Sequence, residues 1–199
     1  MKCFFYTLDT TLEESKGNNS AYNSDGYVDV SNIKWYCEGN MQMKPWRIGG
    51  KNITKTDRKV WTATSMSKEV TKVALTVGSA SSITVNSLKL TVASDADFSN
   101  VIEEQNLNFV ASSTINAVPA QGAWEEGAFY KFTFNVTVSG NSNKFVEFSK
   151  VEFYYDDGGV EKSDPAFSYG DVEEYTINLG ETFQAPALTY ADNFSGTIS

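Results

Sequence analysis

The sequence YKFTFNVTV at residues 130–138 decides the fold. Apolar and polar residues alternate through it without a break, so a strand here would place every large side chain on one face. A second alternating run covers residues 146–155, after turn residues at 140–143, and its phase slips once at Ser149-Lys150. We interpret these two runs as a central antiparallel pair of strands in an all-β domain.

Similar short runs continue along the rest of the chain. They occur at residues 3–8, 27–37, 46–48, 60–63, 72–77 and 83–92. The run at 27–37 slips phase once, which predicts a bulge, and Asn86-Ser87 predicts a hairpin turn. Residues 94–106 are the least strand-like and could hold a capped helical turn. Roughly ten strands before residue 156 favour an antiparallel jelly-roll β-sandwich.

The composition changes after Tyr155, which divides the chain into three parts. Residues 1–157 form the predicted jelly-roll sandwich, residues 158–172 read as a linker, and residues 173–199 contain two further strand-like pieces. A segment of about 28 residues is too short to bury a core of its own. We therefore expect a short C-terminal β extension that docks on the sandwich, pairs with another chain or begins a further repeat.

The charge and the histidine content exclude several classes of function. The formal charge is −9 and the acidic residues are scattered, so neither nucleic acid nor an anionic membrane surface is an expected partner. The chain has no histidine, which excludes Ser-His-Asp and Cys-His nucleophile activation and His-liganded zinc. We predict a protein that is not an enzyme.

The sequence also gives expectations about membrane insertion, export and disulfide formation. No run reaches the roughly 18 consecutive apolar residues of a membrane span, so membrane insertion is not expected. The first residues turn polar too quickly for a signal peptide, so the targeting segment of an exported protein would lie outside this chain. Cys3 and Cys37 either pair or remain as two buried thiols, and the sequence leaves both alternatives open.

Three stretches together resemble a known kind of module. They are NIKWYCEGNMQMKPWRIGGK at residues 32–51, VALTVGSASSITVNSLKLTVASDADFSNVI at 73–102 and GAFYKFTFNVTVSGNSNKFVEFSKVEFYY at 127–155. Residues 1–157 resemble jelly-roll modules of the galactose-binding-like and carbohydrate-binding type from exported multidomain bacterial proteins. The resemblance implies a non-catalytic accessory module, extracellular or at the cell surface, with a glycan as its partner and with further domains in the same polypeptide.

The tail YTINLGETFQAPALTYADNFSGTIS, residues 175–199, resembles the opening strands of a bacterial immunoglobulin-like repeat of group 2. The segments with which that family continues are not present in this sequence, which implies an incomplete repeat. Repeats of this kind commonly space or present other domains. The alternative function is therefore a structural spacer or adhesion module with no small-molecule ligand.

Carbohydrate binding needs an aromatic face for the sugar ring and polar side chains for its hydroxyl groups. The predicted ligand-binding residues are three tryptophans and their polar neighbours: Trp124 with Gln121 and Glu125, Trp46 with Arg47, and Trp61. Trp124 is the first choice, because loops carry function on such scaffolds. For each tryptophan the alternative is a place in the core or at its rim.

Two further observations weigh on this choice. Trp35 is in phase with Ile33 and Cys37, which favours burial, and Tyr36 on the opposite face is a weaker candidate. The polar face of residues 130–138 carries no aromatic side chain, so we expect a ligand at the loop 122–127 and not across that face.

No cofactor is expected, with the exception of a structural calcium ion, which takes several oxygen ligands. Asp95, Asp97 and Asn100, and separately Asp156-Asp157, could donate oxygens. Neither group has the spacing of a recognised calcium loop, so solvated turn residues are the alternative. Paired acids elsewhere do not indicate a glycosidase, because neighbours in a strand point to opposite faces.

Overall fold

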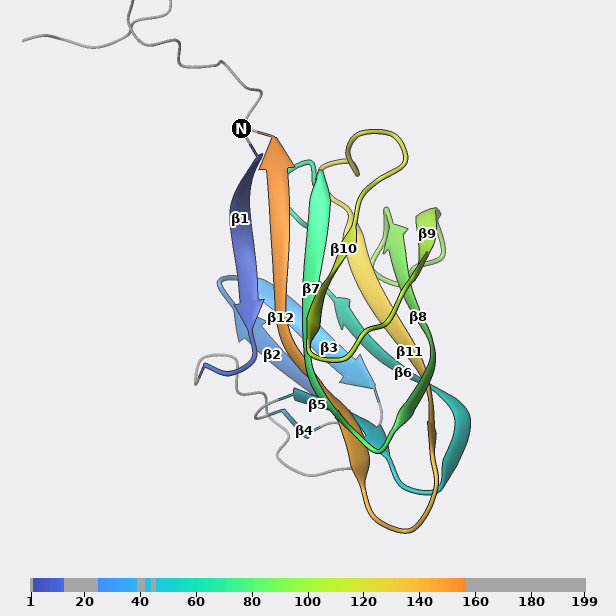
Figure 1. The fold of residues 1–199 in the computed structure, drawn as a ribbon. Coiled ribbons are helices and arrows are strands. Elements are labelled where there is room, and N and C mark those ends of the chain that lie inside the picture. The colour runs from blue at the N-terminus through green and yellow to red at the C-terminus, as the bar shows by residue number, and fades with distance from the viewer. Residues whose placement is uncertain (1, 13–24, 39–41, 44–45, 157–199) are drawn as a thin grey trace, which may run out of the picture. The chain divides into compact units, whose positions relative to one another are not determined.

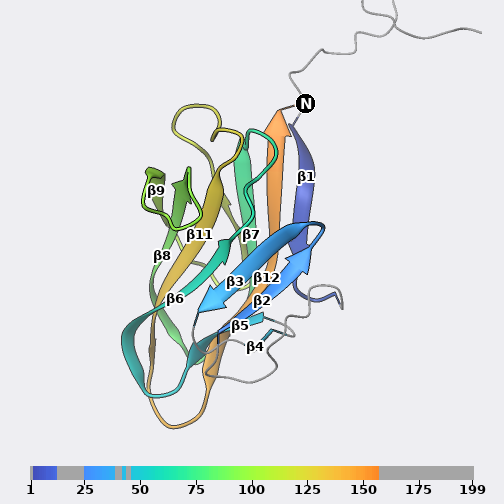
Figure 2. The same cartoon turned by 180° about the vertical axis from the view of Figure 1, so that it is seen from behind.

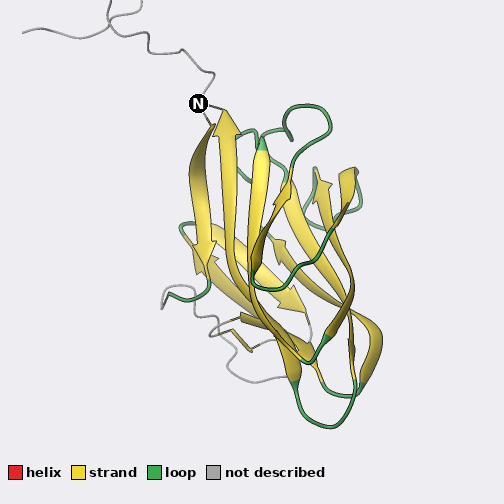
Figure 3. Cartoon of the chain, viewed as in Figure 1, coloured by secondary structure: helices red, strands yellow, loops and turns green. Residues whose placement is uncertain are grey.

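The computed structural model describes residues 2–12, 25–38, 42–43 and 46–156, which form strands and connecting loops without a helix (Figure 3). The described strands belong to one unit, Lys2–Asp157. The predicted all-β class and antiparallel sandwich are confirmed, and the jelly-roll connectivity stays a prediction. The linker predicted at 158–172 and the β extension predicted at 173–199 lie outside the described residues.

One sheet, which we call sheet A, is built around the long strand β12 (Figure 1). Its strands among the described residues are β1 (Lys2–Asp9), β4 (Gln42–Met43), β5 (Trp46–Gly50), β7 (Lys72–Ser81), β10 (Ser113–Ala117) and β12 (Lys144–Asp156). β7 runs along β12 on one side, and β5 and β1 pair with successive parts of β12 on the other. Sheet A is therefore organised by the second alternating run of the sequence.

The other sheet, which we call sheet B, has β11 near its centre and forms the second layer (Figure 2). In the described part of the chain this sheet contains β2 (Gly26–Val30), β3 (Ile33–Glu38), β6 (Ile53–Thr62), β8 (Thr84–Ala93), β9 (Val101–Leu107) and β11 (Phe129–Val138). They are ordered β2-β3-β6-β11-β8-β9. Of its two outermost strands, β2 belongs to the alternating run at 27–37, whereas β9 falls largely in residues 94–106, the segment expected to be least strand-like.

The two decisive alternating runs lie in different sheets. β11 belongs to sheet B and β12 to sheet A, so the predicted antiparallel pair is wrong. Their apolar faces pack against each other instead, with ring centroids 4.9 Å apart for Tyr130 and Phe153 and 5.7 Å apart for Phe132 and Phe148. Alternation determines which face of a strand is buried. The same alternation occurs whether the next strand belongs to the same sheet or to the other sheet, so the sequence pattern does not distinguish the two arrangements.

The phase slip at Ser149-Lys150 corresponds to an irregularity in β12. The pairing of β12 with β7 shifts register between Phe148 and Lys150. Thr10, which is buried, donates its hydroxyl to the carbonyl oxygens of Phe148 at 2.6 Å and Ser149 at 3.0 Å. The carbonyl groups that the irregular pairing exposes therefore keep hydrogen-bond partners inside the protein.

The phase slip within residues 27–37 is a hairpin turn, and the predicted bulge is wrong. Ser31 and Asn32 have φ angles of 50° and 64° and connect β2 to β3. Two successive positive φ angles are typical of a type I′ turn, whose twist matches that of the flanking strands. The hairpin predicted at Asn86-Ser87 is also wrong, because β8 continues through both residues.

The core between the sheets is rich in aromatic side chains. Trp35, Trp46 and Phe153 are fully buried, and the Trp35 ring centroid lies 6.5 Å from that of Trp46 and 6.2 Å from that of Phe153. The burial of Trp35 agrees with its phase in the sequence. Burying one such ring contributes about 1.5–3 kcal/mol to the free energy of folding, so this cluster is a principal source of stability.

Cys37 lies in the same buried layer. Its Sγ donates a 3.3 Å hydrogen bond to the carbonyl oxygen of Gly26, and burial raises the pKa of the thiol to about 12. A thiol with a raised pKa carries little thiolate and reacts slowly. The Cys3 side chain is outside the described side chains, so a pairing of the two cysteines stays an open alternative.

Candidate functional site

Trp124, the first choice for sugar stacking, is part of the core. Its side chain is 2% exposed, and its ring meets that of Tyr130 edge to face with centroids 5.8 Å apart. Its Nε1 donates a 2.8 Å hydrogen bond to Glu103, and its backbone forms two 2.9 Å hydrogen bonds with Val70. The prediction of an exposed Trp124 is wrong, because the loop folds inward and the indole packs in the core.

Trp46 is also unable to offer a ring face to a ligand. It is 0% exposed on β5 and stacks on Phe148 with centroids 5.8 Å apart. The next residue, Arg47, points to the outer face of sheet A, where its guanidinium lies 4.2 Å from the Phe145 ring centroid and 3.8 Å from Glu147. The predicted Trp46-Arg47 pair is therefore divided between the core and the surface, as alternation along a strand requires.

The remaining predicted residues occupy two separate places. Gln121 and Glu125 are exposed in the loop between β10 and β11. Trp61 lies on β6, where Val60 and Thr62 face the core and Trp61 is partly exposed on the outer face of sheet B. The six predicted residues thus do not form one surface, and Trp61 is the tryptophan that a ligand can reach.

Trp61 belongs to a row of side chains that crosses the strands of sheet B. The strand register places Tyr27 opposite Tyr36, Tyr36 opposite Trp61, and Trp61 opposite Lys131. Opposite residues of antiparallel strands lie on one face with Cβ atoms about 4.5–5.5 Å apart. We call Tyr27, Tyr36 and Trp61 the aromatic row. It lies across β2, β3 and β6, the strands in front in Figure 2.

The rings of the aromatic row contact one another and a lysine. Tyr36 and Trp61 stack nearly parallel, with centroids 5.6 Å apart and 19° between planes, and Tyr27 lies 5.9 Å from Tyr36. The Lys34 ammonium is 4.6 Å from the Tyr27 ring centroid and 5.2 Å from that of Tyr36. Its hydrogen bond with Tyr36 raises the pKa of Lys34. Tyr27 is 42% exposed, so the row is open to solvent at the β2 edge.

Sequence reasoning missed this row for a specific reason. In a two-residue hairpin at Ser31-Asn32, Tyr27 and Tyr36 pair directly, so recognising the turn would have placed these rings together. The approach of Trp61 could not be read in this way, because β3 and β6 are joined through a long connection. The polar face of β11 carries no aromatic side chain, as expected. On the same face of sheet B, however, the nearby strands β6 and β3 carry Trp61 and Tyr36.

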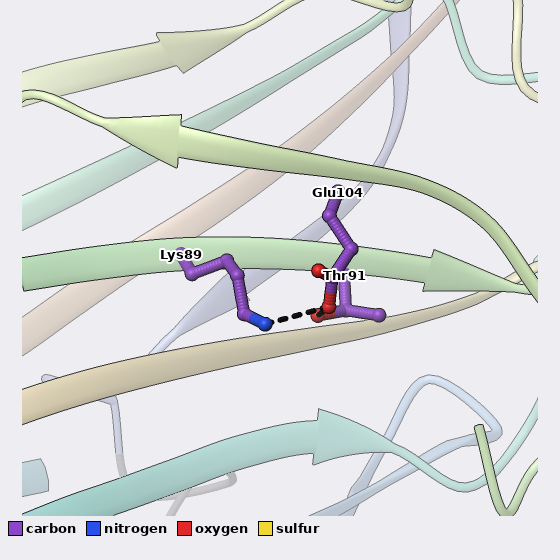
Figure 4. A network of polar contacts seen from close by, with 3 residues as sticks. All are labelled: Lys89, Thr91 and Glu104. Atoms are coloured by element: carbon purple, nitrogen blue, oxygen red, sulfur yellow. Dashed lines mark hydrogen bonds and ion pairs between the residues drawn. The ribbon is translucent and has the colours of Figure 1, made fainter. Parts of the chain in front are cut away.

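Paired charges occupy the rest of the same face. The Lys59 Nζ lies 2.9 Å from a Glu38 carboxylate oxygen. On β8 and β9, the Lys89 Nζ lies 2.6 Å from Glu104 Oε1, which also accepts a 3.1 Å hydrogen bond from the Thr91 hydroxyl (Figure 4). The Lys89 and Thr91 bonds outweigh the opposing effect of burial and lower the pKa of Glu104. This part of the face is therefore a closed polar network.

Lys131 lies between the aromatic row and this network. Its ammonium is 4.0 Å from the centroid of the Phe98 ring. Phe98 belongs to the loop 94–100 and has a φ of 61°, which is strained for a bulky residue. Asp95 holds the loop by accepting hydrogen bonds from the Ser99 backbone and hydroxyl, each at 2.9 Å, and from Asn100. These hydrogen bonds therefore hold the loop in place at the point where the Phe98 ring contacts Lys131.

The calcium hypothesis finds no support in this loop. The Asp95 carboxylate is occupied by donors from Ser99 and Asn100, which is the arrangement of a solvated turn residue. Within residues 2–12, 25–38, 42–43 and 46–156, no group of three or more His, Cys, Asp or Glu side chains could hold a metal ion. Asp157 lies outside the described residues.

Comparison with known protein families finds no family model that matches the chain, and comparison with curated proteins finds no matching sequence. Among the described residues, no helix is long and apolar enough to cross a membrane. The aromatic row and its neighbours are therefore the features of this chain that bear on function.

Proposed function

We propose that residues 1–157 are a non-catalytic carbohydrate-binding-like module whose glycan stacks on the aromatic row of sheet B. The observation that carries the proposal is the partly exposed, ring-to-ring series Tyr27, Tyr36 and Trp61 on a rigid sheet. The resemblance seen in the sequence supports the same function. A place outside the cell or at its surface, and further domains in the same polypeptide, belong to this proposal and rest on that resemblance.

The dimensions of the aromatic row favour an extended ligand. Neighbouring strands are about 4.8 Å apart, so three aromatic residues on adjacent strands span about 10 Å. A sheet holds its side chains more rigidly than a loop does, which lowers the entropy cost of ordering them on binding. The Lys34 ammonium lies over the Tyr27 and Tyr36 rings, and Lys131 is opposite Trp61 in the strand register, so both side chains provide hydrogen-bond donors for hydroxyl groups.

Affinity electrophoresis against a panel of soluble polysaccharides tests this proposal. Trp61→Ala and Tyr36→Ala should each weaken binding at least tenfold, or by about 1.4 kcal/mol. Tyr154→Ala is the matched control, because Tyr154 is a partly exposed ring with a lysine 3.5 Å from its centroid on the outer face of sheet A. The control should bind like the unaltered protein.

Tryptophan fluorescence gives an independent measurement. Trp35, Trp46 and Trp124 are buried, so a ligand on the aromatic row should change the emission of Trp61. Trp61→Phe should retain binding through its remaining ring but lose the change in emission. Binding that is indifferent to Trp61→Ala and Tyr36→Ala would contradict the proposed site.

The alternative is a structural spacer or adhesion module without a small ligand. Burial of three of the four tryptophans favours it, and cross-strand aromatic pairs also stabilise an edge strand such as β2. In that case the row contributes only stability. The same panel separates the two functions, because a spacer binds none of the polysaccharides while Tyr36→Ala still lowers the free energy of unfolding.

A further inference from the structure

We propose that the glycan is acidic, and that Lys131 binds a carboxylate or sulfate group on the sugar next to Trp61. This inference rests on the proposed function, since it names the class of ligand for the same face. It is carried by the position of Lys131 at the inner end of the aromatic row and by the fact that no described carboxylate lies within ion-pair distance of it.

Lys131 differs from the lysines around it. Lys59 and Lys89 lie diagonally from it on the flanking strands β6 and β8, and each has its own carboxylate, Glu38 at 2.9 Å and Glu104 at 2.6 Å. Among the described residues, no carboxylate lies within ion-pair distance of Lys131. Lys59, Lys89 and Lys131 therefore lie close together on the sheet with two acids nearby. Glu38 pairs with Lys59 and Glu104 pairs with Lys89, so Lys131 is the lysine without an ion-pair partner among the described residues.

The position of Lys131 suits a ligand that follows the aromatic row. Its Cα is directly opposite that of Trp61, so an anionic substituent on a sugar stacked over Trp61 would come near the ammonium. On the far side, the Phe98 ring lies 4.0 Å from the ammonium and Thr91 is buried beneath. The aromatic row is therefore exposed to solvent at the β2 edge of sheet B, and its other end lies next to the Lys131 ammonium.

The electrostatics of the site agree with this assignment. Burial lowers the pKa of Lys131, as do Lys59 and Lys89, and Glu104 and Glu38 offset part of the effect. An anion brought to this point would relieve the repulsion among the three lysines. The net charge of −9 does not attract polyanions from a distance, but charges more than about 8 Å away are screened at physiological salt, so the local cation decides.

The test compares acidic and neutral polysaccharides at physiological salt. Polygalacturonate provides the carboxylate arm, chondroitin sulfate the sulfate arm, and a neutral galactan the uncharged arm. Lys131→Met removes the charge and keeps the length of the side chain, and Lys131→Arg restores it. Lys72→Met is the matched control, since Lys72 is stacked on Tyr154 in the same manner on sheet A. Thermal unfolding of each variant checks that the fold is intact.

We expect tighter binding of at least one acidic polysaccharide than of the galactan. Lys131→Met should weaken that binding at least tenfold, Lys131→Arg should restore most of it, and Lys72→Met should leave it unchanged. The arm that binds identifies carboxylate or sulfate. Binding that depends on Trp61 but is equal for acidic and neutral glycans, or is unaffected by Lys131→Met, overturns the acidic ligand alone. Failure to bind any polysaccharide overturns the proposed function as well.

Discussion

The indole nitrogen of Trp124 donates a 2.8 Å hydrogen bond to the carboxylate of Glu103, which joins the loop after β10 to strand β9. The same carboxylate accepts a 2.6 Å hydrogen bond from the Gln105 amide and a 3.3 Å one from the Ala120 backbone. Three donors from two segments converge on one acid. The loop that could have carried a sugar-binding tryptophan is instead closed against the sheet.

Replacing Glu103 with alanine should therefore lower the free energy of unfolding by about 1–3 kcal/mol, because it leaves the buried indole N–H of Trp124 without a partner. Urea unfolding measures the loss. Glu125→Ala, which removes an exposed acid of the neighbouring loop, should change stability by less than about 0.5 kcal/mol. Equal effects of the two substitutions would show that the Glu103 contacts contribute nothing.

Two buried tyrosines should respond differently to loss of their hydroxyl groups. Tyr6 accepts from Trp35 Nε1 at 2.7 Å and donates to the Val30 carbonyl at 3.2 Å, whereas the buried Tyr130 hydroxyl has no hydrogen-bond partner among the described residues. Tyr6→Phe should cost about 1–3 kcal/mol, and Tyr130→Phe should be neutral or stabilise by about 1 kcal/mol.

Urea unfolding of both variants under one set of conditions makes the comparison. The two substitutions remove the same atom from the same residue type, so their difference isolates the hydrogen bonds. A loss of more than about 1 kcal/mol in Tyr130→Phe would mean that its hydroxyl is satisfied in solution, for example by an internal water.

The contrast between Trp61 and Trp124 shows how far the sequence predicts the site. Strand alternation placed the apolar residues of β11 and β12 in the core and gave the fold class. It could not decide burial for Trp124, because a loop has no periodic phase and its orientation depends on Glu103, a partner from another strand. Trp61 meets Tyr36 only through pairing of β3 with β6, a long-range contact that local pattern does not encode.

Stability should fall at alkaline pH because three buried groups resist deprotonation. Burial raises the pKa of Cys37 from its ordinary value of 9.0 to about 12, and burial also raises the pKa of Tyr6 and Tyr130. The folded state then binds more protons than the unfolded state once the pH exceeds the unfolded-state values. The Cys37 contribution is complete below about pH 9 and the two tyrosine contributions below about pH 10. Above these values each group loses up to about 1.4 kcal/mol per pH unit.

Thermal unfolding between pH 8 and pH 11 checks this dependence. Tyr130→Phe should reduce the slope above pH 10, because it removes one of the buried groups whose pKa is raised. A melting temperature that stays constant to pH 11 would contradict the assignment of these groups as buried and protonated.

The turn at Ser31-Asn32 should control both the stability of the hairpin and the aromatic row. Asn32 has a φ of 64°, a conformation that glycine adopts freely and that β-branched residues resist. Asn32→Gly should keep or slightly raise the free energy of unfolding, whereas Asn32→Val should lower it by about 1–2 kcal/mol. Tyr27, Tyr36 and Trp61 contribute to the near-ultraviolet circular dichroism together with the core aromatic side chains, and Asn32→Val should weaken their contribution by disturbing the register that pairs Tyr27 with Tyr36. If valine at this position were tolerated without loss of stability or signal, the type I′ turn could not be what sets this register.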